Sequence, residues 1–199
     1  MIIGIDEVGR GPLAGPVVVA CVALSSSFAL KAKKLTKLKP PLPLRDSKKL
    51  TAKQRMAWNE WIRKNPAIRF CIARVSPKTI DAINISAAAN CAAYRAYKKI
   101  ANNSNTPALL DAGIRLPKTV SQQSIIKGDE KIPAIALASI LAKVSRDGYM
   151  ERMHKRYPHY NFNKNKGYGT ATHIKTLKRH GPCPLHRLTF IRKILNPNI

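Results

Sequence analysis

Residues 1–24 read MIIGIDEVGRGPLAGPVVVACVAL, and this stretch decides the fold. It begins with a β-rich run over residues 1–8 and ends with a continuous apolar run over residues 16–24, rich in Val, Ala and Cys. Such runs are typical of buried strands. The three glycines over residues 9–15 are typical of a turn region. The sequence therefore predicts a β-hairpin at the start of a sheet.

Helical and strand patterns alternate along the rest of the chain, which predicts a mixed α/β sheet with helices packed on it. Thr51 is a suitable N-cap for a helix that runs to about Lys64. We expect further helices over residues 80–101, 132–156 and 170–180, and further strands over residues 67–75, 106–111 and 124–127. The length of 199 residues suits a single domain over 1–199, with a helical C-terminal region from about residue 150.

The chain carries 36 Lys and Arg against 10 Asp and Glu, a formal net charge of +26. This excess predicts a polyanionic partner, with nucleic acid ahead of an anionic membrane surface. Apolar runs are shorter than the roughly 20 residues that a membrane-spanning helix needs, so we expect no membrane span. There is no leader pattern, and the four scattered cysteines lack CxxC spacing. We therefore expect reduced thiols and a cytoplasmic protein.

Residues 25–44 differ in character from their surroundings. Five lysines between positions 31 and 39 are followed by three prolines between positions 40 and 43. The composition predicts a basic surface loop that ends in a stiff segment. Two interpretations stay open, a solvated excursion and a direct contact with the polyanionic partner.

Four acidic residues stand where strands are predicted to end. Asp6 and Glu7 are adjacent at the end of an apolar run, Asp111 ends another, and Asp129 follows Gly128. Partly desolvated carboxylates raise one another's pKa unless a cation lies between them. A cluster of hard oxygen ligands suits Mg²⁺ or Mn²⁺ and does not suit zinc. The alternative for Asp111 or Asp129 alone is an ordinary turn or N-cap residue.

These carboxylates belong to a longer pattern. Residues 5–16, IDEVGRGPLAGP, resemble the opening motif of ribonuclease HII. Further matches follow in that family's order at residues 45–50 (RDSKKL), 109–111 (LLD), 127–129 (KGD), 138–147 (ASILAKVSRD), 167–170 (GYGT) and 186–187 (HR). The resemblance covers nearly the whole chain. It implies a ribonuclease H-like fold, in which helices flank a mixed five-stranded sheet and the C-terminal part is helical.

The resemblance also implies roles for individual residues. The metal-binding, catalytic carboxylates would be Asp6, Glu7, Asp111 and Asp129. The segment formed by Gly9, Arg10 and Gly11 would recognise the ribonucleotide, Tyr168 would contact the neighbouring sugar, and Ser47 and Lys48 would bind substrate. Glycines suit this task because they let the backbone come within hydrogen-bonding reach of a ligand. Only RNA offers a 2′-hydroxyl to such a contact.

The predicted helix over residues 132–156 carries a polar stripe. Ser139, Lys143 and Asp147 are spaced four residues apart, so they share one helix face. Ser139 and Lys143 are candidates for binding a phosphate, while Asp147 would orient Lys143 or Arg146 in a supporting layer. The alternative is a solvated stripe, which is common on helices.

The function expected from the resemblance is endonucleolytic cleavage of RNA in RNA–DNA hybrids, and cleavage 5′ of ribonucleotides embedded in duplex DNA. Two Mg²⁺ or Mn²⁺ ions would serve a monomeric enzyme that leaves 3′-hydroxyl and 5′-phosphate ends. The charge alone would also fit a non-catalytic RNA-binding protein. A second alternative is another two-metal nuclease of the same fold, such as a Holliday-junction resolvase. The sequence departs from the family at Ala112, where a glycine is usual. We assign no chemistry to His173 or His186.

Overall fold

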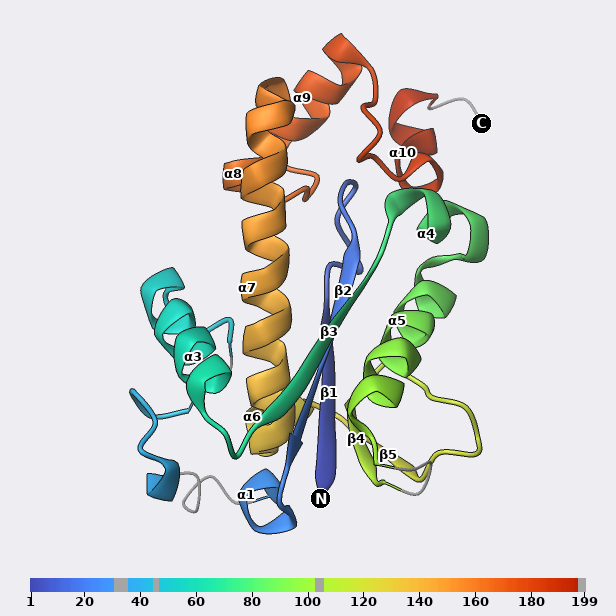
Figure 1. The fold of residues 1–199 in the computed structure, drawn as a ribbon. Coiled ribbons are helices and arrows are strands. Elements are labelled where there is room, and N and C mark those ends of the chain that lie inside the picture. Colours follow the sequence, from blue (N-terminus) through green and yellow to red (C-terminus); the bar gives the residue numbers. More distant parts are fainter. Residues whose placement is uncertain (31–35, 45–46, 103–105, 197–199) are drawn as a thin grey trace.

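The structure is a computed structural model, and it describes residues 1–30, 36–44, 47–102 and 106–196. Its centre is a five-stranded sheet with the order β3-β2-β1-β4-β5 (Figure 1). The strands are β1 (Ile2–Val8), β2 (Val17–Leu24), β3 (Arg69–Val75), β4 (Ala108–Asp111) and β5 (Gln122–Ile125). The β1–β2 and β2–β3 pairs are antiparallel, whereas the β1–β4 and β4–β5 pairs are parallel. This arrangement confirms the predicted mixed sheet.

The predicted hairpin is confirmed, because Ile2 pairs with Leu24 and Val8 with Val18. Every residue of β2 is buried. Side chains alternate between the two faces of a strand, so a strand that is covered on both faces reads as an unbroken apolar run. Val17, Val19 and Cys21 pack in one core, whereas Val18 and Ala20 pack in the other.

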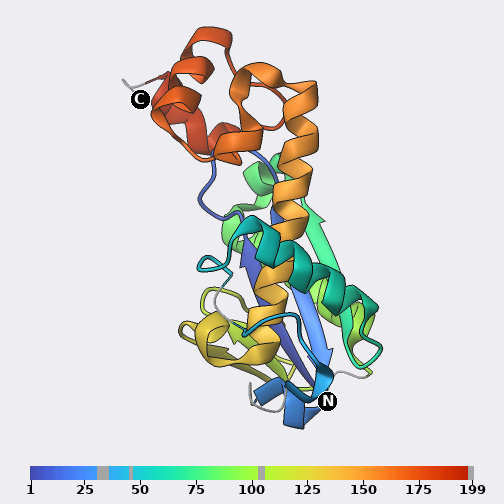
Figure 2. The same cartoon turned by 90° about the vertical axis from the view of Figure 1, so that its left-hand side faces the viewer.

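Helices cover both faces of the sheet. On one side lie α3 (Ala52–Lys64) and α7 (Pro133–Arg156), which cross each other in Figure 2, and on the other lie α4 (Pro77–Ile83) and α5 (Ile85–Ile100). Helix α7 packs directly on β1, since a Cβ on Gly4 would lie 2.2 Å from the backbone carbon of Ala134. Thr51 caps α3 through a complete capping box with Gln54, as its position predicted.

The predicted single helix over residues 80–101 is wrong. The structure has two helices, because Asn84 adopts a left-handed φ of 65° and its side chain accepts a hydrogen bond from the backbone of Ala87. Asn tolerates this conformation and caps a new helix, so it breaks a pattern that Ala-rich composition otherwise favours. The first helix also begins earlier, at Pro77, after the N-cap Ser76.

The predicted strand over residues 124–127 is also shifted, since β5 ends at Ile125. Lys127 has a left-handed φ of 54°, which ends the extended conformation, and the short helix α6 (Gly128–Lys131) follows. Within the predicted basic loop, α1 (Ser26–Leu30) and the 3-10 helix η1 (Thr36–Leu38) form, and Lys37 and Lys39 are exposed. Lys31, Lys33 and Lys34 lie outside the described residues.

The second half of α7 rises beyond the sheet and carries a group of short helices (Figure 2). These are η2 (Pro158–Tyr160), α8 (Phe162–Asn165), α9 (Ala171–His180) and α10 (Leu188–Leu195). Their small core contains Tyr160, Phe162 and Leu185, and it includes Ala14 from the turn between β1 and β2. The N-terminal turn and the C-terminal helices are therefore packed together. No helix in the described part of the chain is both long and apolar enough to cross a membrane.

Candidate active site

Asp6 and Glu7 lie near the end of β1, beside helix α7. Asp6 is only 5% exposed, and its Oδ1 accepts a hydrogen bond from the backbone N–H of Glu7 at 2.7 Å. Ser139, on the buried face of α7, also hydrogen-bonds to Asp6, and its hydroxyl lies 2.7 Å from the Ser47 hydroxyl. Of the predicted substrate-binding set, Ser139 therefore contacts the first carboxylate, and Ser47 contacts Ser139.

The other two carboxylates come from neighbouring elements. Asp111 ends β4, and its Oδ1 accepts the backbone N–H of Gly128 at 2.9 Å. A Cβ at position 128 would lie 2.6 Å from the terminal methyl of Ile135 and 3.3 Å from Oδ1 of Asp111, so a larger residue would have to displace these side chains. The turn delivers the buried Asp129, whose Oδ2 lies 3.7 Å from Nζ of Lys48. Both carboxylates thus reach the same edge of the sheet as the end of β1.

The carboxylates interact unfavourably with one another in the absence of a cation. Burial raises the pKa of Asp6 well above its usual value, and the charges of Glu7 and Asp111 add to the rise. Burial likewise raises the pKa of Glu7 to about 7, against the opposing charge of Arg10 and together with Asp111. Among the described residues, Oε2 of Glu7 is buried without a hydrogen-bond partner. An orphaned carboxylate oxygen beside other carboxylates fits a divalent cation.

The cluster is nevertheless open. Within the described ranges, no three His, Cys, Asp or Glu side chains already stand in an arrangement that could hold an ion. Cationic side chains lie at its margin: Lys48 near Asp129, and Arg10, whose Nη1 lies 3.7 Å from Oε1 of Glu7. Lys48 is mostly exposed, so its attraction is screened by solvent. The first two residues of the motif over 45–50 lie outside the described residues.

The Gly9–Gly11 turn directly follows the strand that carries Asp6 and Glu7. Gly9 has a φ of 93°, and a Cβ there would lie 2.3 Å from the Arg146 side chain, so the fold requires glycine. Gly11 is different, because it is exposed and a Cβ would meet no atom within 4 Å. The Arg10 side chain turns back toward the protein, where it donates to the Gly113 carbonyl at 3.2 Å and the Ser86 hydroxyl at 3.0 Å. The outer surface of the turn is therefore mainly backbone.

Two fully buried arginines support this turn. Arg187 donates to the carbonyls of Gly9, Arg10 and Gly15, and Arg146 donates to those of Ala14, Pro16 and Lys166. Burial, followed by the charge of Arg146, lowers the pKa of Arg187 to about 9. The motif over residues 186–187 was visible in the sequence, but its role in supporting the turn was not.

Tyr168 is attached to the same scaffold. It is 45% exposed, and the Arg146 guanidinium lies 6.0 Å from its ring centroid. The backbone of Leu13 donates to the carbonyl of Gly167 at 2.8 Å, so the turn and the Tyr168 loop are joined directly. Nδ1 of His173 donates to the Tyr168 carbonyl at 2.7 Å. The two segments predicted to recognise the ribonucleotide and its neighbour therefore form one connected surface.

The polar stripe of α7 divides between two environments. Ser139 lies within the carboxylate cluster, whereas Lys143 forms an ion pair with Asp147 at 2.9 Å. Of the two partners considered for Asp147, the contact is with Lys143. Arg146 points instead to backbone carbonyls.

The sequence matches the family model described as ribonuclease HII over residues 3–193. The chain belongs to the ribonuclease HII family. It is 45% identical over 195 residues to the ribonuclease HII of Caldanaerobacter subterraneus subsp. tengcongensis, a match that covers 98% of this chain and 75% of that protein. Membership makes this chain a ribonuclease H, a hydrolase of the endonuclease class, and it disfavours the non-catalytic RNA-binding alternative.

Solved structures show the same architecture. The ribonuclease HII in the PCNA:RNase HII complex from Archaeoglobus fulgidus has a TM-score of 0.74 and 28% identity, covering 94% of each chain. A Bst ribonuclease HIII solved in complex with Mn²⁺ has a TM-score of 0.65 and 16% identity, covering 98% of this chain and 68% of that one. The second likeness concerns the fold alone. Together they confirm the predicted ribonuclease H-like fold.

Proposed function

We propose that this ribonuclease HII hydrolyses the RNA strand of RNA–DNA hybrids and cuts on the 5′ side of ribonucleotides embedded in duplex DNA, leaving 3′-hydroxyl and 5′-phosphate ends. The observation that carries the proposal is the electrostatic interaction of Asp6, Glu7 and Asp111 in a chain of net charge +26. Asp129 directly follows Gly128, whose N–H binds Asp111. A protein that only binds a polyanion gains nothing from collecting buried carboxylates beside it.

We infer that these four carboxylates hold two Mg²⁺ or Mn²⁺ ions when substrate is bound. The raised pKa of Asp6 and Glu7 and the unpartnered Oε2 of Glu7 support this inference. The solved ribonuclease HIII complex with Mn²⁺ shares the fold. When bound, such ions neutralise charge at the scissile phosphate and activate the attacking water.

The chain's own residues would position the carboxylates and the substrate. Ser139 and the Glu7 N–H hold Asp6, the Gly128 N–H holds Asp111, and Arg10 lies beside one oxygen of Glu7. We infer that three polar side chains contact phosphates of the substrate, namely Ser47, Lys48 and Lys143. Lysine and serine commonly make such contacts with nucleic acids. Asp147 would hold Lys143 in place.

Choice of the bond would depend on the 2′-hydroxyl, because phosphates of RNA and DNA look alike to a cation. The exposed backbone at Gly11 offers groups that can approach a sugar closely, and the exposed Tyr168 ring can pack against the sugar that follows. A deoxyribose would fit closely there, and a ribose would crowd the ring. This arrangement supports cleavage 5′ of a ribonucleotide that is followed by DNA.

The test is to incubate the protein with a duplex that carries one ribonucleotide, in Mg²⁺, in Mn²⁺ and in chelator, and to map the cut. We expect one metal-dependent cut 5′ of the ribonucleotide, with a 3′-hydroxyl end. Asp6→Asn and Asp129→Asn should each abolish turnover while hybrid binding is largely kept. Near-normal activity of Asp6→Asn in Mg²⁺ contradicts the assignment. We also propose that the enzyme acts as a cytoplasmic monomer, and sedimentation of the active species tests its assembly state.

A further inference from the structure

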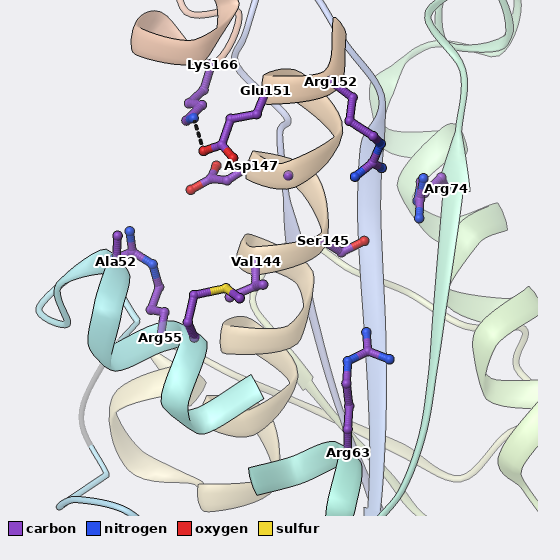
Figure 3. A pocket seen from close by; sticks show the side chains of 12 residues that line it. Ala52, Arg55, Arg63, Arg74, Val144, Ser145, Asp147, Glu151, Arg152 and Lys166 are labelled. Atoms are coloured by element: carbon purple, nitrogen blue, oxygen red, sulfur yellow. Dashed lines mark hydrogen bonds and ion pairs between the residues drawn. The ribbon is translucent and has the colours of Figure 1, made fainter. Parts of the chain in front are cut away.

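A groove of about 630 Å³ lies outside the carboxylate cluster, on the flank of α7 between α3 and the edge strand β3 (Figure 3). Val144 and Gly148 of α7 line it together with four arginines from the three elements. In Figure 3 Arg63, Arg74 and Arg152 point toward the groove from three different elements. None of the site residues assigned above accounts for this convergence.

The acidic residues of the groove are already neutralised. Asp147 pairs with Lys143 at 2.9 Å, and Glu151 pairs with Lys166 at 2.8 Å. By contrast, the exposed Arg63, Arg74 and Arg152 make no ion pair with any carboxylate in the described residues. The groove therefore holds an excess of positive charge that nothing in the described part of the protein balances.

Two of these guanidinium groups are held by aromatic rings. Arg63 lies over the Phe70 ring at 5.1 Å, and Arg74 lies over the Tyr149 ring at 5.8 Å. Stacking on a ring face limits the freedom of the guanidinium but leaves N–H groups at its edge available. Arranged in this way, the arginines lose less entropy when they bind an anion than unrestrained side chains would.

Gly148 gives an independent indication that the groove is kept open. It lies inside the 24-residue helix α7, where glycine costs about 0.5–1 kcal/mol relative to alanine. A Cβ at this position would meet only Nη1 of Arg152, at 3.7 Å, an ordinary contact. Packing therefore does not demand glycine. What its missing side chain provides is a bare groove floor beside Arg152.

Two side-chain contacts link residues that line the groove to residues near the candidate active site. Asp147 lines it and pairs with Lys143, which lies one turn of α7 from Ser139 beside Asp6. Arg55 also lines it, and donates to the carbonyl of Ser47 at 3.0 Å, next to Lys48. A nucleic-acid strand that extends from the carboxylate cluster along this side of α7 would reach the three exposed arginines of the groove.

We propose that this groove binds the phosphodiester backbone of the substrate nucleic acid beyond the cleavage site. Guanidinium groups match phosphate oxygens in geometry as well as charge. The inference rests on the proposed function for the class of partner. The inference does not depend on the cleavage chemistry. Measuring nucleic-acid binding in the presence of a chelator therefore tests the groove separately from catalysis.

The test compares two triple variants that remove the same charge. Arg63→Ala/Arg74→Ala/Arg152→Ala empties the groove, whereas Arg95→Ala/Lys98→Ala/Lys99→Ala removes three exposed charges from α5 on the opposite face of the sheet. Affinity is measured in EDTA at several salt concentrations, for a short hybrid that spans only the carboxylate cluster and for one extended by a helical turn at either end. Cleavage of the short hybrid in metal is recorded independently, so a failure of the proposed function shows there.

For the long hybrid, we expect the groove variant to flatten the slope of log affinity against log salt by about 2 to 3, as expected for three lost phosphate contacts. The α5 variant should change the slope much less. Equal flattening by both variants overturns the proposal, because net charge alone would then account for it. The proposal is also overturned if the groove variant loses binding of polyglutamate but keeps wild-type binding of the long hybrid, a result that would indicate an acidic protein partner.

Gly148→Leu supplies a second test that does not depend on charge. Leucine favours helix more than glycine does, so the variant should keep or raise its melting temperature. Its side chain would fill the groove floor, and we expect it to weaken binding of the long hybrid more than binding of the short one. Unchanged binding of the long hybrid by this folded variant contradicts a groove-bound strand.

Discussion

The buried guanidinium of Arg187 donates to the carbonyl oxygen of Arg10 at 2.7 Å, although 177 residues separate the two along the chain. The same guanidinium holds the carbonyls of Gly9 and Gly15. One side chain from the C-terminal region therefore sets the orientation of the peptide groups in the N-terminal turn. Because a peptide's N–H is fixed relative to its carbonyl, Arg187 also sets where the turn's donors point.

The Arg187→Lys variant separates the hydrogen bonds that Arg187 makes to the turn carbonyls from its positive charge. Lysine keeps the positive charge but lacks the planar fork that contacts three carbonyls. We expect kcat on a duplex with one embedded ribonucleotide to fall by about 100-fold, the order expected for a misplaced contact near the reacting group. Loss on a continuous RNA–DNA hybrid should be smaller. Equal losses on both substrates, in step with a lower melting temperature, would indicate a purely structural arginine.

The two glycines of the turn should respond differently to alanine. Gly9→Ala meets the Arg146 side chain and a φ of 93°, so it should lower stability by roughly 1 kcal/mol or more. Gly11→Ala meets no atom of the described protein and should keep the wild-type melting temperature. If the backbone at this position approaches a sugar, Gly11→Ala should still lose activity on RNA-containing duplexes. Full activity of the Gly11→Ala protein would contradict the proposed contact between the backbone of residue 11 and a sugar.

Asp6→Asn should stabilise the metal-free protein while removing its response to metal. Burial and the charges of Glu7 and Asp111 act against an ionised Asp6. Asparagine carries no charge to desolvate, so the variant should have a higher free energy of unfolding than the wild type in EDTA at neutral pH. Wild-type protein should gain stability from Mn²⁺ by mass action, and the variant should gain little. Thermal unfolding with and without Mn²⁺ measures both effects, and a destabilised variant in EDTA would contradict the prediction.

The buried pair of His173 and His186, whose Nε2 atoms lie 3.1 Å apart, should make stability depend on pH. Burial, then the neighbouring His173, lowers the pKa of His186 from 6.5 to about 4. The unfolded chain therefore binds more protons between these values, and stability is fully present above pH 6.5 and lost as the pH falls toward 4. The shift of His186 alone corresponds to a loss on the order of 3 kcal/mol. Cys183 and Tyr160 also face the pair.

The measurement compares wild type with His186→Gln across this pH range. The difference in unfolding free energy isolates the histidine, because contributions from Glu7 and Asp6 are common to both proteins. We expect the wild type to lose stability relative to the variant as the pH is lowered. If the difference in unfolding free energy stays constant from about pH 7 to about pH 4, His186 binds protons equally in the folded and unfolded states, which contradicts the prediction.

Tyr168→Ala tests how the enzyme recognises the junction between RNA and DNA. The ring is exposed and lies over a buried arginine rather than within the core, so its loss should change the melting temperature little. We expect a far larger loss of activity on a duplex with one embedded ribonucleotide than on a continuous hybrid. Tyr168→Phe should retain most of both activities, since it keeps the flat ring. Equal losses for the alanine variant would leave Tyr168 with a general packing role.

Much of the secondary structure is specified by short stretches of sequence, so the sequence alone determined it. The apolar runs on either side of Gly9–Gly15 specify the β1–β2 hairpin, and Thr51 specifies the start of α3. The acidic residues were also visible, because so few exist that each one at a strand end is conspicuous. The errors were local too. Asn84 breaks a helix that composition favours, and the left-handed backbone of Lys127 prevents the predicted extension of β5.

The tertiary structure decided how distant groups support one another. Side-chain periodicity reports which face of an element is buried, but not which carbonyl a buried guanidinium will reach. That choice depends on how helix α7 and the C-terminal helices pack around the turn at Gly9, and it brings Arg146 and Arg187 against it. The groove beside Gly148 arises in the same way, since its arginines belong to three elements that meet only when the chain is folded.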